Sequence, residues 1–125
     1  MQTLTMVAVL SAVGKFIKSG KLGGQKHDKC RYNYGDGCRC VIGTGFNDET
    51  FAKFGVNSTC NTNRVLQLET DNIILLPKGD ERSDLASLQR AHDAWASSAS
   101  VSKQTRRKAF YKLLHQMRKK YGVPA

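Results

Sequence analysis

Several features that define common protein classes are missing from this sequence. No apolar run approaches the roughly 20 residues that a membrane-spanning helix requires, and there is neither an internal repeat nor a low-complexity tract. The apolar start of the chain lacks the preceding basic residues of a signal peptide, since Lys15 and Lys18 follow it. These absences argue against a membrane, repeat or exported protein. They predict a cytoplasmic protein with no membrane partner.

Recognisable catalytic motifs are missing as well. The chain has only three histidines, and none lies in a metal-hydrolase pattern such as H-E-x-x-H. His92 and Asp93 are adjacent, as in some phosphohydrolases, but the further ligands of such sites are missing, so His92 is expected to pack beside Trp95. The Gly-Thr-Gly segment 43–45 lacks the third glycine of a phosphate-binding loop. We therefore expect no enzymatic activity and no catalytic residues.

Apolar periodicity predicts that most of the chain is helical. Residues 4–17, 85–95 and 103–120 each carry apolar side chains at steps of three or four, which gather on one face of a helix. Glycine accepts the left-handed conformation that ends many helices, so the first helix should end near Ser19 and Gly20. The three apolar stripes are Leu4, Val7, Leu10, Val13 (or Gly14) and Ile17; then Leu85, Leu88, His92 (or Ala91) and Trp95; then Phe110, Leu113, Leu114, Met117 and Tyr121.

Shorter elements are expected between these helices. Residues 29–43 alternate through β-prone side chains around Gly-Asp-Gly, which predicts a β-hairpin with its turn at residues 35–37. The 125 residues suffice for one core, so the sequence predicts an α+β fold, a small single domain over residues 1–125 that is mainly helical with a β-hairpin. A short helix should follow, capped by Asn47 or Asp48 and ended by Gly55, and then a loop over 56–63. Residues 64–77 are ambiguous between a strand and a helical turn. Residues 78–84 should form a charged turn, in which Ser83 or Asp84 caps the next helix.

One stretch combines a histidine with three cysteines in the spacing H-x2-C-x7-C-x-C. A hairpin can bring such donors around a tetrahedral zinc, although the usual C-x2-C pair is missing. A disulfide between Cys30 and Cys40 would cross the hairpin, but a cytoplasmic setting disfavours it. The interpretation that we favour is that the cysteines are buried as small hydrophobic residues, so that no cofactor is expected. The possible zinc ligands are His27, Cys30, Cys38 and Cys40, with Cys60 as a replacement for His27.

Two short patterns carry a resemblance to known proteins. The first is C-x-Y-x-x-x-x-G-x-x-C-x-x-G, and the second is the helical pattern L-Q-x-x-H-D. In this order they resemble a scattered group of small, mostly uncharacterised phage and prophage proteins, over roughly residues 27–96. The resemblance implies a viral accessory protein, a kind that commonly acts against host defences, and it implies no reaction. The matching residues are Cys30, Tyr32, Gly37, Cys40 and Gly43, then Leu88, Gln89, His92 and Asp93, so Cys38 and Cys60 lie outside the pattern.

Acidic residues are absent from the last predicted helix, which is rich in basic ones. Residues 103–120 contain eight Lys or Arg and no Asp or Glu. Opposite charges at i, i+4 would stabilise the helix by roughly 0.2–0.5 kcal/mol per pair, whereas like charges destabilise it. Together with the net charge of +10, this pattern indicates an anionic partner such as DNA or RNA. The predicted binding residues are Lys103, Arg106, Arg107, Lys108, Lys112, Arg118, Lys119 and Lys120.

These features together predict a phage-type, non-enzymatic inhibitor of a host defence that targets nucleic acids, similar to an anti-CRISPR protein. Its partner would be a host effector protein or nucleoprotein, in the cytoplasm of an infected bacterium. Two other functions fit the same charge. One is a DNA- or RNA-binding regulator of the phage's own genome, and the other is a protein that sequesters a nucleotide in a basic pocket.

Overall fold

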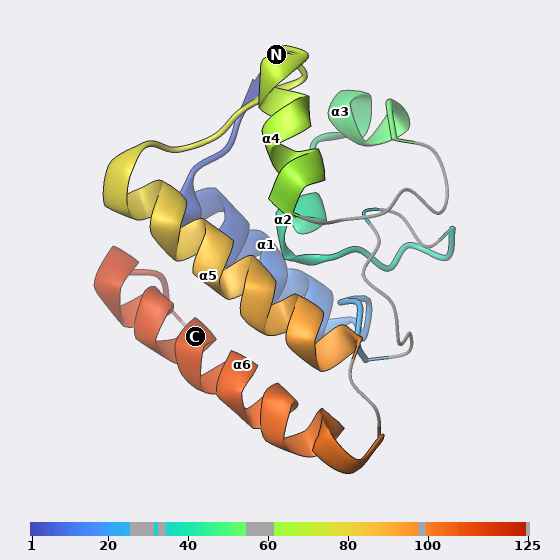
Figure 1. The fold of residues 1–125 in the computed structure, drawn as a ribbon, viewed down its shortest axis with the longest axis vertical. Coiled ribbons are helices and arrows are strands. Elements are labelled where there is room, and N and C mark those ends of the chain that lie inside the picture. Colours follow the sequence, from blue (N-terminus) through green and yellow to red (C-terminus); the bar gives the residue numbers. More distant parts are fainter. Residues whose placement is uncertain (26–31, 33–34, 55–61, 98–99, 125) are drawn as a thin grey trace.

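The computed structural model describes residues 1–25, 32, 35–54, 62–97 and 100–124 (Figure 1). Most of the described chain is helical, as predicted. Within these ranges no helix has both the length and the apolar character needed to cross a bilayer. In chain order the elements are β1 (Gln2–Thr3), α1 (Met6–Lys18), α2 (Val41–Thr44), α3 (Asp48–Ala52), α4 (Thr62–Thr70), β2 (Ile74–Leu75), α5 (Gly79–Ala96) and α6 (Ser100–Tyr121).

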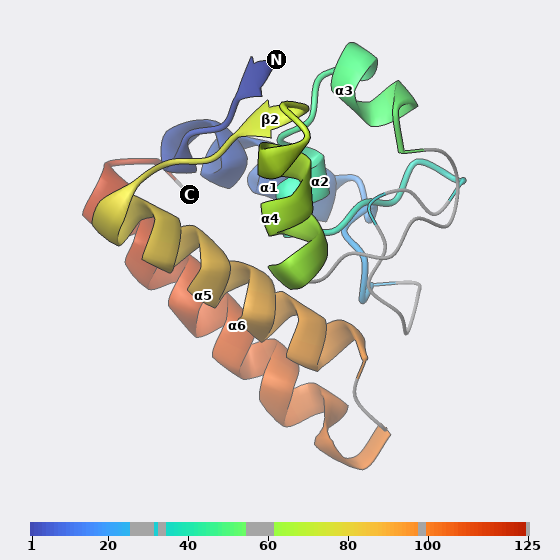
Figure 2. The same cartoon turned by 45° about the horizontal axis from the view of Figure 1, so that its top comes forward.

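Three long helices form the body of the molecule. Helices α5 and α6 run side by side in opposite directions, and α1 packs against both (Figures 1 and 2). The short α2 lies against α1 and α5, and the two strands pair beside α4 (Figure 2). Helix α6 therefore packs against both α5 and α1, and among the described residues its opposite side is exposed.

Aromatic side chains attach α6 to the rest of the core. Trp95 of α5 and Phe110 of α6 are both buried, with ring centroids 5.4 Å apart. His92 packs against both rings, at 5.9 Å from Trp95 and 5.7 Å from Phe110, and its Nε2 lies 2.7 Å from the carbonyl oxygen of Gly23. The prediction that His92 packs beside Trp95 is confirmed, and this histidine serves the core rather than a metal-hydrolase site.

The first helix lies where the sequence predicts it, but its buried face differs in part. Thr5 caps it by accepting a hydrogen bond from the Ala8 amide (3.2 Å), and Gly20 follows it with φ 71°. The predicted stripe was wrong at Val7, which is 49% exposed. The other positions of the stripe agree with the prediction, since Leu4, Leu10 and Val13 are buried and Ile17 packs against the core. The buried residues of α1 are Met6, Val9, Leu10 and Val13.

The predicted β-hairpin over residues 29–43 is wrong. The strands are instead β1 and β2, which pair in parallel with Gln2 opposite Ile74. In the described part of the hairpin segment, residues 35–40 form no strand, and Arg39 makes a single parallel bridge to Leu22. The alternating β-prone side chains predict strands, whereas Tyr32, Cys38 and Cys40 are buried although they lie in no strand. Gly35 and Gly37 have positive φ values of 85° and 89°, so the chain bends at residues 35–37, but this bend does not join two strands.

Helix α5 begins earlier than predicted, so the expected charged turn over residues 78–84 is wrong. Its first turn carries Asp80 and Glu81, which suit the positive end of a helix dipole. Arg82 holds this turn in place, because its guanidinium donates to the Pro77 carbonyl (2.9 Å) and pairs with Glu69 of α4. The hydrogen bond from Arg82 lowers the pKa of Glu69 despite partial burial. A contact distant in sequence therefore sets this helix start.

The remaining short elements agree with the sequence in part. Asn47 caps α3 as predicted, accepting a hydrogen bond from the Thr50 amide at 2.8 Å, while the predicted stop at Gly55 lies outside the described residues. The ambiguous segment 64–77 contains both a helix and a strand, since α4 occupies its first part and β2 follows. Helix α4 begins at Thr62, within the predicted loop 56–63. Helix α2 was not predicted.

Candidate nucleic-acid interface

Two neighbouring helices contain no acidic residue. Helix α1 carries Lys15 and Lys18 in its last turn, and α6 carries the eight basic residues predicted to bind a partner. Together these ten side chains make up half of the 20 Lys and Arg residues of the chain. Because α1 packs beside α6, their positive charges add on one side of the molecule. The eight predicted residues lie on three sides of α6.

The outer side of α6 presents a line of basic side chains. Lys108, Lys112 and Lys119, together with His115, follow one another at steps of four, three and four residues, and all are exposed. This spacing keeps them on one helix face, opposite the buried Phe110 and Leu114. The line extends over about 16 Å at 1.5 Å per residue. We call Lys108, Lys112 and Lys119 the outer stripe. They form no ion pair within the described residues.

The side of α6 that faces α5 is largely engaged within the protein. Lys120 pairs with Asp84 at 2.7 Å, and the Tyr121 hydroxyl donates to the same carboxylate at 2.6 Å. Burial and this hydrogen bond raise the pKa of Tyr121 to about 12, and the two donors lower the pKa of Asp84. Arg106 reaches the Ala94 carbonyl at 3.4 Å. Both side chains are exposed, but their bonds to α5 leave them fewer donors for a partner.

The third side of α6 faces α1 and the loop after it. Lys103 and Arg107 line a hollow of about 350 Å³ together with Trp95 of α5. The Arg107 guanidinium also lies 5.4 Å from the centroid of the Tyr111 ring. Farther along, Arg118 lines a second hollow, between α6 and α1. Lys103 and Arg118 are half-buried and Arg107 is exposed at the edge of its hollow, an arrangement that suits recognition of a small anionic group better than contact with a long polymer.

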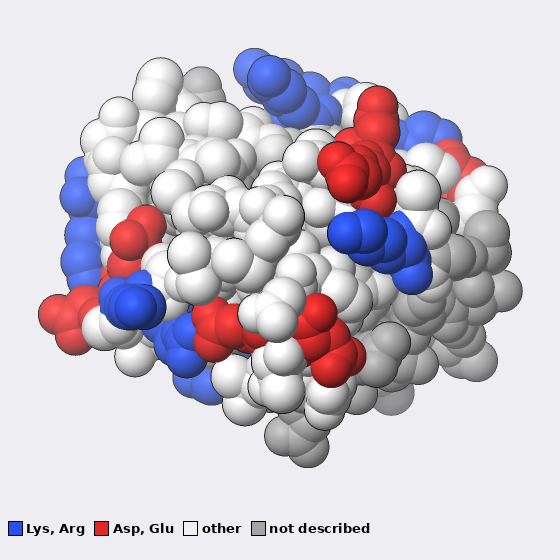
Figure 3. All heavy atoms as spheres, turned by 90° about the horizontal axis from the view of Figure 1, so that it is seen from above, with Lys and Arg blue, Asp and Glu red and all other residues white. Residues whose placement is uncertain are grey.

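Charges of both signs occupy another face of the molecule. Figure 3 looks onto the end where α3 and α4 lie in Figure 1, and it shows separate Lys or Arg and Asp or Glu groups around a largely uncharged surface. Among the described residues, this face has no continuous basic region. The outer stripe of α6 is therefore the better candidate for a polyanion.

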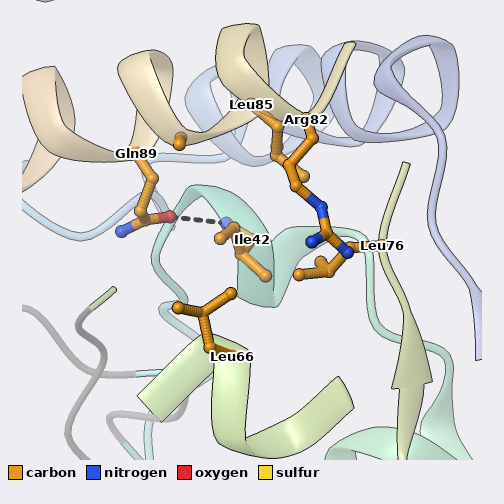
Figure 4. A pocket seen from close by; sticks show the side chains of 7 residues that line it. Ile42, Leu66, Leu76, Arg82, Leu85 and Gln89 are labelled. Atoms are coloured by element: carbon orange, nitrogen blue, oxygen red, sulfur yellow. Dashed lines mark hydrogen bonds between the residues drawn. The ribbon is translucent and has the colours of Figure 1, made fainter. Parts of the chain in front are cut away.

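An apolar hollow joins α2, α4 and α5 (Figure 4). Its volume is about 50 Å³, far below the roughly 300–1,000 Å³ of small-molecule sites. The Gln89 side chain at its edge accepts a hydrogen bond from the Ile42 amide at 2.8 Å, which satisfies a buried donor at the start of α2. This hollow is a packing feature. Its lining is Ile42, Leu66, Leu76, Arg82, Leu85, Ala86 and Gln89.

The cysteine cluster can be described only in part. His27, Cys30 and Cys60 lie outside the described residues, so the zinc and disulfide hypotheses stay open. Cys38 and Cys40 are both fully buried, and the Cys40 sulfur accepts the Gly43 amide at 3.5 Å as the cap of α2. Within the described ranges, no three His, Cys, Asp or Glu side chains gather as a metal site would require. The favoured interpretation, packed thiols, stays a prediction.

We expect the purified protein to contain well under one zinc per chain. Cysteine thiols packed as small apolar groups need no metal, and Cys40 already uses its sulfur as a helix cap. Elemental analysis by plasma mass spectrometry measures the zinc content directly. One equivalent of zinc in the parent, lost in Cys38→Ser, would show that these thiols are ligands.

Comparison with known proteins finds no matching protein-family profile, no matching curated protein and no matching solved structure. Sequence reasoning missed Lys15, Lys18 and His115 as members of the basic surface. The absence of acids from residues 6–18 was the available signal for the two lysines.

Proposed function

We propose that this protein binds the nucleic acid of a host nucleoprotein through the outer stripe of α6. In this role it acts without catalysis, as a phage-type inhibitor of a host defence that targets nucleic acids. The observation that carries the proposal is the line of three exposed lysines on an acid-free helix. Phosphate contacts of this kind add up along a polymer and release counterions, so they need no specific pocket. The resemblance to phage proteins supports the defence-related role.

A regulator of the phage's own genome would use the same lysines. The two functions differ in what the protein binds when it is alone. An inhibitor of a nucleoprotein effector should block a purified guide-RNA-loaded nuclease at about one protein per effector, with weak affinity for bare duplex DNA. A regulator should bind bare duplex DNA or RNA tightly and leave the nuclease active.

Neutralising the outer stripe should weaken nucleic-acid binding. In Lys108→Gln/Lys112→Gln/Lys119→Gln the helix should persist, because glutamine is nearly as good a helix former as lysine. Loss of three phosphate contacts should make the plot of log K against log salt concentration less steep. The magnitude of its negative slope should fall by about 2 for single strands and about 3 for duplex DNA. Fluorescence anisotropy with a labelled single-stranded RNA and a labelled duplex DNA, at several NaCl concentrations, measures both affinity and slope.

The matched control removes the same net charge elsewhere. Lys53→Gln/Lys78→Gln/Arg90→Gln changes three exposed basic residues, which lie at the end of α3, at the start of α5 and within α5. This control should keep the parent's salt slope, and circular dichroism should show the same helix content in all three proteins. If the two triple variants lose affinity equally, only net charge matters and the outer stripe is not the contact surface.

A further inference from the structure

Helices α1 and α6 enclose a groove on a different side of α6 from the outer stripe. Its volume is about 310 Å³, within the range of sites that hold small molecules. The lining combines apolar side chains with three cations, and within the described residues it contains no acid. The residues are Leu10, Ser11, Gly14, Lys15, Ile17 and Lys18 from α1, and Tyr111, Arg118, Val123 and Pro124 from α6 and the segment after it.

The guanidinium of Arg118 lies against the backbone of α1. A methyl group built on Gly14 would stand 3.1 Å from Arg118 Nη2, so the glycine provides the space that this side chain occupies. Arg118 Nε is buried and has no hydrogen-bond partner among the described residues. Glycine is a poor helix former, and a buried donor without a partner is unfavourable. A ligand that offers a hydrogen-bond acceptor to Arg118 Nε would explain both unfavourable features, the glycine within the helix and the buried donor.

The end of α6 closes the groove. Gly122 adopts φ 68°, the Val123 amide donates to the Arg118 carbonyl (2.9 Å), and the Gly122 amide donates to the Lys119 carbonyl (3.4 Å). These two bonds and the left-handed glycine form a Schellman motif, which reverses the chain after the helix. The reversal places Val123 and Pro124 in the lining of the groove. The groove is therefore built from three segments.

The chemistry of the lining selects a ligand with two unlike parts. Arg118, Lys15 and Lys18 provide donors and positive charge for a phosphate, which arginine and lysine bind by charge-assisted hydrogen bonds. Tyr111, Leu10 and Ile17 provide an aromatic and apolar surface for a flat base. We propose that this groove binds a nucleoside monophosphate unit, either as a free nucleotide or as the 5′-terminal nucleotide of an RNA or DNA chain. This proposal does not depend on the outer stripe.

Isothermal titration calorimetry with AMP, GMP, CMP and UMP tests the site, with adenosine and inorganic phosphate as partial ligands. At least one monophosphate should bind, at least tenfold more tightly than adenosine or phosphate alone. Arg118→Gln and Lys15→Gln/Lys18→Gln should each weaken that binding at least tenfold, and the double variant changes only exposed side chains. The triple variant of the outer stripe should bind the nucleotide as the parent does, even if it loses RNA.

Gly14→Ala gives an independent readout. Alanine favours the helix, so the melting temperature should not fall, but the new methyl displaces the guanidinium and should weaken nucleotide binding.

A comparison of RNA that carries a 5′-phosphate with the same RNA that carries a 5′-hydroxyl shows whether the ligand is a free nucleotide or a chain end. If the protein prefers the RNA with the 5′-phosphate, and Arg118→Gln removes that preference, the ligand is a chain end. If the two RNAs bind equally while a monophosphate still binds, the ligand is a free nucleotide. Failure of all four monophosphates to bind, or binding that Arg118→Gln leaves unchanged, would overturn the proposal.

Discussion

The Gly24→Ala variant is expected to lose about 3 kcal/mol of unfolding free energy. Gly24 has φ 94°, a conformation that costs other residues of order 1–3 kcal/mol. A methyl group there would stand 3.0 to 3.2 Å from three atoms of the Trp95 indole. That ring is fixed between His92 and Phe110, so the overlap adds an overpacking cost of about 1–3 kcal/mol. Urea denaturation, followed by the fluorescence of the single tryptophan, measures the loss.

Gly20→Ala separates the two causes. Gly20 also has a positive φ, at 71°, but a methyl group there would meet no atom within 4 Å. It should therefore lose only the conformational part, about 1 kcal/mol. Equal losses at the two glycines would mean that the indole gives way without cost, and that Trp95 is held less tightly than the structure indicates.

Phe110→Ala is expected to destabilise the protein by about 3–5 kcal/mol, the usual cost of removing a fully buried phenylalanine. Its ring is inaccessible to solvent and contacts Trp95, His92 and Tyr111. Since small domains are stable by only about 5–15 kcal/mol, this loss is a large fraction of the total. The same urea titration, with circular dichroism as the signal, measures it.

Lys112→Ala is the matched control on the same helix. Lys112 is exposed, and alanine is at least as good a helix former, so its unfolding free energy should stay within about 0.5 kcal/mol of the parent. A loss below about 1 kcal/mol for Phe110→Ala would show that α6 is not packed against α5 as described, and the side assigned to each of its cations would no longer hold.

The parts of the fold that depend on a few adjacent residues were predictable from the sequence. Gly20 and Asn47 marked helix ends correctly because capping and left-handed glycine are local effects. The apolar stripe through Phe110 and Leu114 predicted α6 correctly, because a long run of apolar residues at steps of three and four fits a helix and few other structures. The other elements required information from distant parts of the chain. Strands β1 and β2 have two residues each, too few for any periodic signal, and the start of α5 depends on Glu69.

The basic side chains of the candidate site were predictable, but their division among three sides of α6 was not. Counting charges cannot show that Lys120 is paired with Asp84, or that the outer stripe is exposed. The groove was missed because it requires α1 beside α6. Gly14, a glycine inside an otherwise apolar helix, was the available signal: such a residue often permits the close approach of another group.

The position of β1 has a consequence for the order in which the chain folds during synthesis. Its partner ends at Leu75, the Gln2 side chain donates to the Gly45 carbonyl at 2.6 Å, and the Met6 amide donates to Glu81. None of these contacts exists until the later segment has been made. At about 5–20 residues per second, roughly 4–15 s pass between the first residue and Leu75. Once α1 has been made, its apolar face lacks the later segments that cover it, so the ribosome-bound protein should be a substrate for chaperones that its finished form no longer needs.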